Sequence, residues 1–396
     1  MGQAIPRFST ESLTSILDQV HTLGRDCIAP HADAVDREAR FPSEAFEALR
    51  GAKLLSCYVP VEYGGMGLTI ADVSKICEAL ALYCGSTAMV FAMHQIQVAC
   101  IVHHALGSEF FRGYMRDLVE HQYLLASATT ELGVGGDVRS SLCAVEVTGE
   151  RFSLVKQAPV ISYGQNADAI LVTARRAPDA GRSDQVHVLV TKQDATLKPI
   201  SEWNTLGFRG TCSLGFTLTA EGSTQQILPV PYVEIHARTM HPFSHSVWAS
   251  LWLGIATDAM NRARGFVRAE ARRTPGTMPP SALRLAEADT VLFTFRGGVQ
   301  NTVGEYHRLL EAGDNSAFVS NYGFSSRINN LKITASQLVV EVVGKAMLIC
   351  GISGYRNDSA YTLGRQLRDA YGAALMVNND RILIQSSTMQ LFQREN

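Results

Sequence analysis

A glycine-rich stretch at residues 130–137 combines side chains and backbone groups that could hold a ligand. Its sequence, Thr-Glu-Leu-Gly-Val-Gly-Gly-Asp, places a hydroxyl and a carboxylate before three closely spaced glycines. Such glycines let backbone amides approach a bound pyrophosphate, where a β-carbon would collide. Much later in the chain, Arg368 and Asp369 stand side by side within residues 367–370. Each motif alone is weak evidence for a ligand site, and the two together in this order are stronger evidence.

Histidines are the second set of residues that could do chemistry. His94 lies in an apolar stretch, residues 86–106, that predicts a helix buried among other helices. A single histidine in such a helix is more often a hydrogen-bonded core residue than a catalytic one. His241 and His245 have the spacing of metal ligands, but Pro242 disfavours a regular helix there. We therefore expect these two only to line a pocket, and we expect no metal site.

The composition is typical of a globular enzyme without a nucleic-acid or membrane partner. The chain has 396 residues, of which 46% are hydrophobic and 18% charged, and its net charge is −2. No basic block is present to neutralise phosphates, and we expect no apolar stretch long enough to span a membrane. The eight cysteines are scattered without CxxC pairs, and no secretory signal pattern is visible. A cytoplasmic protein with reduced thiols is expected.

The period of the hydrophobic residues predicts an α+β fold in three regions. Residues 1–120 and 236–396 have helical periods, whereas residues 121–235 have the short alternating runs of strands. Residues 145–154 alternate around a Thr-Gly-Glu turn and predict a hairpin. Three late helices are expected, at about 280–313, 325–350 and 362–393.

Four motifs in this order resemble the acyl-CoA dehydrogenase superfamily, over essentially the whole chain. They lie at residues 59–67, 130–137, 206–211 and 368–370. The resemblance implies an acyl-CoA dehydrogenase-like fold with an N-terminal helical domain, a central β-barrel domain and a C-terminal four-helix bundle.

The resemblance also implies a flavin cofactor, FAD in the first place and FMN in the second. The positions that match the family's cofactor-binding residues are Thr130, Gly135, Gly136, Ser162, Arg272, Thr274 and Gly351. Of these, Ser162 would bond near flavin N5, and Arg272 and Thr274 would hold phosphates across a subunit boundary, for which the planar fork of Arg is suited. Val160 stands where the family has an indole, and residues 348–352 keep one glycine of the family's cofactor motif.

The family's catalytic carboxylate is missing from this sequence. Its commonest position falls on Val377, and the alternative position falls near Ser244. Removal of an α-proton from a thioester needs a positioned base. A dehydrogenase would therefore use a relocated base, for which Asp380, Glu131 and His245 are candidates.

A second reaction class is open, in which a flavin-dependent monooxygenase of the same fold uses a C4a-(hydro)peroxide. The resemblance then gives His94 and Ser162 the role of stabilising that oxygen adduct. α,β-Dehydrogenation is the first expectation because it is the commonest chemistry of the family. A flavin-binding protein without turnover is a third possibility.

The substrate implied by the resemblance is an acyl thioester, carried by CoA or by an acyl-carrier protein. The residues expected to line its site are Glu131, Ser244, Trp248 and Val377. Trp248 would make a restricted or aromatic pocket if it faces inward, although it is also suited to fill the core. Members of the family are dimers or tetramers, so a homotetramer or a homodimer is expected.

Overall fold

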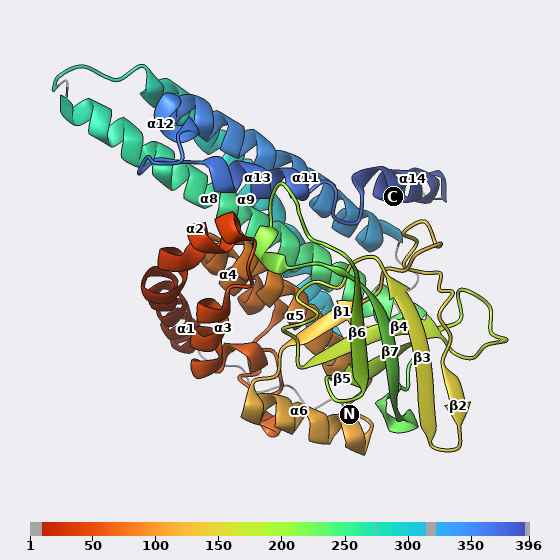
Figure 1. Cartoon of the computed structure of the whole chain (residues 1–396). Helices are drawn as coiled ribbons and strands as arrows, with labels where there is room; N and C mark the ends of the chain where they lie inside the picture. Colours follow the sequence, from red (N-terminus) through yellow and green to blue (C-terminus); the bar gives the residue numbers. More distant parts are fainter. Residues whose placement is uncertain (1–9, 274, 314–321, 393–396) are drawn as a thin grey trace.

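The N-terminal part of the chain is a cluster of helices, as the helical period predicts (Figure 1). The computed structural model describes residues 10–273, 275–313 and 322–392. The helices are α1 (Thr10–Leu23), α2 (Ala29–Glu38), α3 (Ser43–Gly51), α4 (Ile70–Ala81), α5 (Gly85–His104) and α6 (Glu109–His121). Helix α4 begins with a capping box, in which Thr69 and Asp72 satisfy each other's backbone N–H groups.

Helix α5 is buried on nearly every side, as expected from its apolar sequence. By length and composition alone, residues 85–104 and 323–350 could cross a membrane, which corrects the expectation that no segment is long enough. The α5 segment is 89% buried inside the protein and the later segment is 50% buried. A helix enclosed by its own protein has no face left for lipid, so α5 acts as a core helix.

The middle region contains two sheets that follow the predicted strands. Strands β1 (Leu125–Ala128), β4 (Ala169–Arg175) and β5 (Gln185–Thr191) form one sheet, in which β1 and β4 are parallel. The other sheet has the antiparallel order β2 (Glu146–Thr148), β3 (Arg151–Ala158), β7 (Gly215–Ser223), β6 (Ala195–Ser201). The predicted hairpin is confirmed as β2 and β3. The predicted β-barrel domain thus takes the form of two sheets, which Figure 1 shows beside the helices.

The C-terminal region is helical, and most of its helices lie where they were predicted. They are α7 (Tyr232–Ile235), the π-helix η6 (His236–Met240), α8 (His241–Arg273), α9 (Ser281–Ala312), α11 (Tyr322–Cys350), α12 (Ile352–Tyr355), α13 (Gly364–Gly372) and α14 (Asn379–Phe392). Helices α9 and α11 match two predicted ranges. The domain boundaries after residues 120 and 235 stay predictions.

Two local predictions in this region are wrong. Residues 362–393 are not one helix, because the chain turns between α13 and α14 at Val377, whose φ of 48° lies in the left-handed region. The side chain of Asn378 then accepts a bond from the N–H of Asp380 at 2.9 Å and starts a new helix. Pro242 does not prevent a helix, since it lies in the first turn of α8, directly after the π-helix η6, and the chain stays helical through it.

Helix α8 packs against α4 at a point where only glycine fits. A β-carbon on Gly254 would lie 2.7 Å from the β-carbon of Ala81 and would also meet the carbonyl oxygen of Glu78. Real β-carbons essentially never approach other atoms so closely, so the two helices could not keep their separation. Gly265, three turns later in α8, has only an ordinary contact of 3.5 Å to Tyr361.

Gly254→Ala should therefore lower the free energy of unfolding by about 1–3 kcal/mol through overpacking. Gly265→Ala is the matched control in the same helix, and it should raise that free energy by up to about 1 kcal/mol because alanine favours helix. Urea unfolding of the three proteins checks this. Equal effects of the two substitutions would contradict the close packing of α4 and α8.

Candidate functional site

The glycine-rich segment after β1 adopts the open conformation that its sequence predicts. Gly133, Gly135 and Gly136 have φ angles of 86°, 61° and 77°, a region that side chains rarely adopt. Gly135 and Gly136 are exposed to solvent. Thr130 is half-buried at the start of the segment, where its hydroxyl donates to the carbonyl of Val160 at 3.2 Å. We call residues 130–137 the glycine loop.

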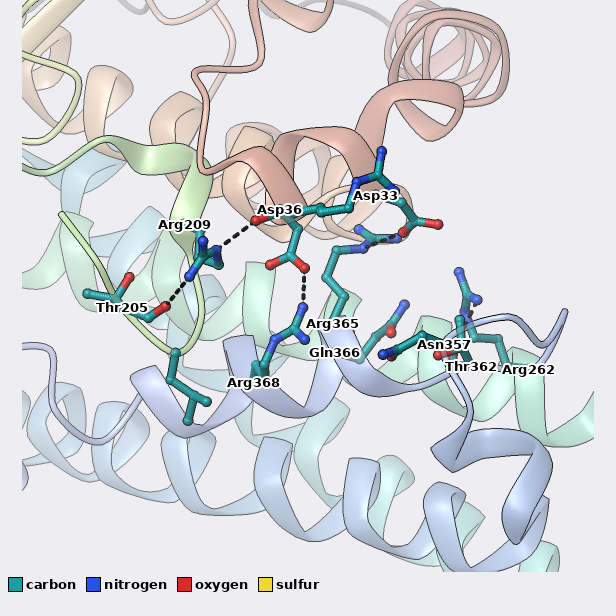
Figure 2. Close-up of a pocket in the computed structure, with 12 residues that line it drawn as sticks. Asp33, Asp36, Thr205, Arg209, Arg262, Asn357, Thr362, Arg365, Gln366 and Arg368 are labelled. Atoms are coloured by element: carbon teal, nitrogen blue, oxygen red, sulfur yellow. Dashed lines mark hydrogen bonds and ion pairs between the residues drawn. The ribbon is translucent and has the colours of Figure 1, made fainter.

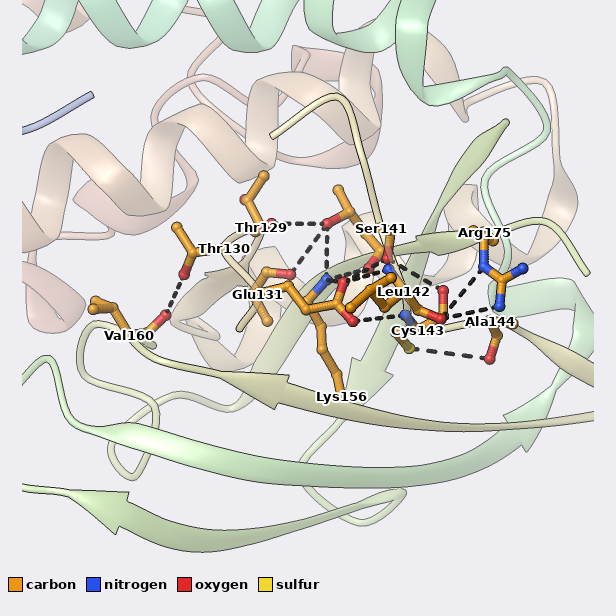
Figure 3. Close-up of polar contacts among 12 residues, drawn as sticks. Thr129, Thr130, Glu131, Ser141, Leu142, Cys143, Ala144, Lys156, Val160 and Arg175 are labelled. Atoms are coloured by element: carbon orange, nitrogen blue, oxygen red, sulfur yellow. Dashed lines mark hydrogen bonds and ion pairs between the residues drawn. The ribbon is translucent and has the colours of Figure 1, made fainter. Parts of the chain in front are cut away.

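Glu131 anchors the glycine loop to the strands behind it (Figure 3). Its buried carboxylate accepts bonds from Ser141 Oγ at 2.6 Å, Leu142 N at 3.1 Å and Cys143 N at 2.6 Å. The buried Nζ of Lys156, on β3, lies 3.2 Å from the same carboxylate. Burial alone would raise the pKa of Glu131, but Lys156 and these donors outweigh burial and hold the pKa below its ordinary value.

Glu131 is therefore neither a catalytic base nor a substrate ligand, which corrects two predictions. A carboxylate that already accepts four hydrogen bonds and whose pKa is lowered does not take a proton from a weak carbon acid. Lys156 also donates to the carbonyl of Thr173 on β4 at 2.7 Å. The pair consequently ties the glycine loop to both sheets.

Ser162 stands at the end of a chain of hydroxyl groups. Ser213 Oγ donates to Ser162 Oγ at 2.8 Å, and Thr211 Oγ1 lies 2.8 Å from Ser213 Oγ. Thr211 also bonds the carbonyl of Phe208 at 2.8 Å, and the N–H of Phe208 donates to Asp369 at 2.6 Å. Because Ser162 accepts from Ser213, its own proton is available to a ligand.

Asp369 holds this hydroxyl-bearing segment against α13. Its carboxylate is buried, which raises its pKa to about 6 against the opposing effects of the Phe208 N–H and Arg365. A β-carbon at Gly207 would collide with the backbone around Arg368. The Arg-Asp motif of the sequence thus joins α13 to the segment that positions Ser162.

A cavity of about 450 Å³ lies beside this junction (Figure 2). Arg365 pairs there with Asp33 at 3.3 Å, and Arg368 pairs with Asp36 of α2. Arg209 donates to the carbonyl of Asp36 at 2.7 Å. Since each guanidinium already has an acceptor, these arginines clamp α2, α13 and the 205–209 segment together.

His94 is a structural residue, so its predicted role toward oxygen is wrong. The side chain is fully buried, its Nε2 lies 2.8 Å from the carbonyl of Leu55, and its Nδ1 accepts the N–H of Leu125 at 3.0 Å. Burial lowers its pKa to about 4. A neutral imidazole with both nitrogens committed to backbone has nothing left for a ligand.

A row of rings lies at the start of α8. Consecutive ring centroids are 4.5–5.8 Å apart, and the rings belong to His187, Tyr232, His236, His241, His245 and Trp248. Burial lowers the pKa of His245 well below its ordinary value, so its ring is neutral. In the described part of the chain, His245 Nδ1, Trp248 Nε1 and both ring nitrogens of His187 have no hydrogen-bond partner. Of this row, His241, His245 and Trp248 are the predicted pocket or site residues.

The two vacated base positions hold no group that could replace a carboxylate. Val377 is 46% exposed in the turn between α13 and α14. The hydroxyl of Ser244 is buried and donates to the carbonyl of His241 at 3.0 Å. Asp380 is exposed in the first turn of α14, and no ion pair with its neighbour Arg381 is present among the described residues.

Lys332 is a buried polar residue that the sequence analysis missed. Its Nζ donates to Asn379 Oδ1 at 2.6 Å, and burial lowers its pKa to about 8. Lysine in an amphipathic helix usually reaches solvent, so its sequence context contained no sign of burial. The bond holds the first residue of α14 against α11.

Two of the residues predicted to bind the cofactor, Arg272 and Gly351, are distant from the glycine loop in this chain. Arg272 is exposed in the last turn of α8, and Gly351 is exposed beside α12, which Figure 1 places at the opposite end of the helical region from the strands. Thr274 lies outside the described residues.

Breaking the Glu131–Lys156 pair should be costly. Glu131→Gln or Lys156→Met should each lower the free energy of unfolding by about 3–5 kcal/mol, because each leaves an uncompensated buried charge. The double variant should lose less than the sum of the two. Urea unfolding at pH 7 measures all four proteins, and additive losses would mean that the two side chains do not act as a pair.

The same pair makes the free energy of unfolding depend on pH. Because the folded pKa of Glu131 is lowered, its contribution is present above the ordinary carboxylate pKa and is lost as pH falls through the folded value. Wild-type protein should therefore lose more stability than Glu131→Gln between about pH 5 and pH 3.

Comparison with known proteins gives these features a family context. Residues 10–122 match the family model described as acyl-CoA dehydrogenase, N-terminal domain. Cyclohex-1-ene-1-carbonyl-CoA dehydrogenase of Geobacter metallireducens is 25% identical over 367 residues, which cover 91% of this chain and 93% of that protein.

Solved structures share the fold over nearly the whole chain. FMN-bound TdsC from Paenibacillus sp. A11-2, a dibenzothiophene monooxygenase, has a TM-score of 0.84 at 20% identity, over 96% of this chain and 98% of TdsC. Butyryl-CoA dehydrogenase from Megasphaera elsdenii has a TM-score of 0.80 at 19% identity, over 98% of this chain and 100% of that enzyme. Similarity at these identities establishes the fold.

Proposed function

Because the chain belongs to the acyl-CoA dehydrogenase superfamily, we propose that it is a flavin-dependent oxidoreductase. FAD is the proposed cofactor and FMN, which TdsC binds, is the second candidate. A bound flavin supplies a hydride acceptor or, once reduced, a reaction with oxygen.

The residues of the described chain fit such a cofactor. The left-handed glycines let the backbone of the glycine loop approach a flat or phosphate-bearing molecule. The hydroxyl of Ser162 accepts a bond from Ser213 and is thereby oriented to donate its own proton to a ligand. The side chain of Val160 is smaller than an indole and leaves more space for the ring of the cofactor. Thr130 lies beside Val160, because its hydroxyl donates to the carbonyl of that residue.

We infer that oxygenation is the reaction that this site supports best, ahead of α,β-dehydrogenation. The observation that carries this inference is the lack of an available carboxylate among the described candidates. Glu131 is saturated, Asp369 holds Phe208, and Asp380 is exposed at a helix start. Dehydrogenation of a thioester begins with removal of the α-proton by a base, whereas oxygen transfer does not begin with removal of a proton from carbon.

In this proposal the hydroxyl of Ser162 donates a hydrogen bond to the flavin. The imidazole of His245 is neutral there because burial lowers its pKa. His245 has an unpartnered Nδ1 at the start of α8, and it can exchange a proton with a substrate. Trp248 contributes an indole N–H and an apolar face at the same place.

Dehydrogenation of an acyl thioester is the second candidate function, because the curated relative is a CoA-ester dehydrogenase. His245 would then be the base, through the same unpartnered Nδ1. Its lowered pKa makes it a weak base, and this places the reaction second. The substrate would be an acyl-CoA or an acyl-carrier protein, with Ser244, Trp248 and Val377 near its acyl group.

A homotetramer or homodimer is the proposed assembly. Large apolar side chains that are at least 68% exposed lie on the C-terminal helices, among them Phe293, Leu348, Ile352 and Tyr355. Burying them against a second copy would remove apolar surface from water. Arg272, Thr274 and Gly351 would then reach the cofactor of a neighbouring subunit. The free cysteines agree with a reducing, cytoplasmic location.

Stopped-flow mixing of the reduced, flavin-loaded protein with oxygen tests the proposed reaction. Oxygenation predicts a transient absorbing species before the oxidised flavin spectrum returns. Ser162→Ala should shorten the lifetime of that species about tenfold through loss of one hydrogen bond, whereas Ser183→Ala, on the exposed β4–β5 loop, should not change it. Slow oxidation without a transient in the wild type would contradict oxygenation.

Anaerobic addition of butyryl-CoA to the oxidised protein tests the second function. We expect the flavin absorbance to remain, since no carboxylate is available to start dehydrogenation. Bleaching that is abolished by His245→Gln would instead establish dehydrogenation with His245 as the base.

A further inference from the structure

Arg381 extends from the first turn of α14 to the glycine loop. Its guanidinium donates to the carbonyl of Gly135. A β-carbon on Gly136 would lie 2.8 Å from its Cζ and would collide with Nη1. The side chain thus occupies the space that glycine leaves at this position. A residue other than glycine at 136 would push Arg381 out of the loop.

Most of the hydrogen-bonding capacity of this guanidinium is unused. Within the described residues, Arg381 has one acceptor, the Gly135 carbonyl, and forms no ion pair. The exposed carboxylate of the glycine loop belongs to Asp137, and it pairs with another arginine, since its Oδ1 lies 3.6 Å from Arg139 Nε. A guanidinium carries five N–H donors in a planar fork, and this fork matches the oxygens of a phosphate.

Two further sources of positive potential meet at the same place. Successive backbone N–H groups of a segment with left-handed residues form a concave site that attracts anions, and Gly133, Gly135 and Gly136 are all left-handed. The start of α14, two residues before Arg381, adds the positive end of a helix dipole. Because Thr130 and Ser162 lie at the other end of the glycine loop, this group of donors is separated from them.

We propose that Arg381 binds the phosphate of the flavin cofactor, with the glycine loop amides completing the site. The inference rests on the proposed function and assigns a phosphate ligand from the same chain that holds the ring. Glycine at position 136 then has two effects. It permits the left-handed backbone conformation, and the lack of a β-carbon leaves space for the guanidinium of Arg381.

Titration of the purified full-length protein with FAD, FMN and riboflavin, followed by flavin fluorescence, tests this assignment. Arg381→Met should raise the Kd of FMN and FAD about 10- to 100-fold, because a charged hydrogen-bond donor is lost. The Kd of riboflavin, which has no phosphate, should stay within about twofold. Arg176→Met is the control, because Arg176 is also solvent-exposed but already pairs with Asp184 on the β4–β5 loop.

Gly136→Ala supplies an independent variant. It should raise the Kd of FMN by displacing Arg381, and the double variant Gly136→Ala/Arg381→Met should bind FMN no worse than the weaker single variant. Thermal unfolding of each variant verifies that the fold is retained.

Two outcomes would overturn the assignment while leaving the proposed function intact. In one, Arg381→Met binds all three flavins as wild type does. In the other, riboflavin binding falls as much as FMN binding, which would mean that Arg381 only orders the loop. Failure of the wild-type protein to bind any of the three flavins would overturn the proposed function itself.

Discussion

The carboxylate of Glu131 is the constraint on which the candidate site depends. The glycine loop has three left-handed residues and few contacts of its own, so its shape must be imposed from outside. Glu131 does so by accepting backbone and side-chain donors from residues 141–143 and the buried ammonium of Lys156. A buried charge pair of this kind is tolerated because four donors, one of them the ammonium itself, bond the carboxylate.

The polar motif residues of this chain mostly hold backbone in place. Asp369 fixes the segment that bears the hydroxyl chain to Ser162, and His94 joins α5 to β1 and to the 54–56 turn. Each buried polar atom that bonds a backbone group avoids a desolvation penalty of about 1–3 kcal/mol. These residues therefore shape the site through the backbone that they hold.

The chemistry of the site follows from which titratable groups remain free. With Glu131 and Asp369 engaged, the groups left free in the proposed site are the neutral imidazole of His245, the hydroxyl of Ser162 and the guanidinium of Arg381. Such a site lacks a strong base but offers proton donors, which suits a flavin reacting with oxygen better than one accepting hydride from a thioester. The similar proteins that are named as CoA-ester dehydrogenases have the same fold, so the fold itself is compatible with dehydrogenation.

The sequence alone determined the order of helices and sheets, the glycine loop and the lack of a carboxylate at Val377 and Ser244, because periodicity, glycine spacing and motif order are local properties. Only the tertiary structure decided which polar residues are free. His94 and Glu131 have the chemistry of catalytic groups, but distant partners such as Leu55 and Lys156 consume it. Arg381 carried no predicted role, and the break after α13 directs it to the glycine loop. Contacts between segments far apart in the chain leave no pattern in either segment, so the sequence could not reveal them.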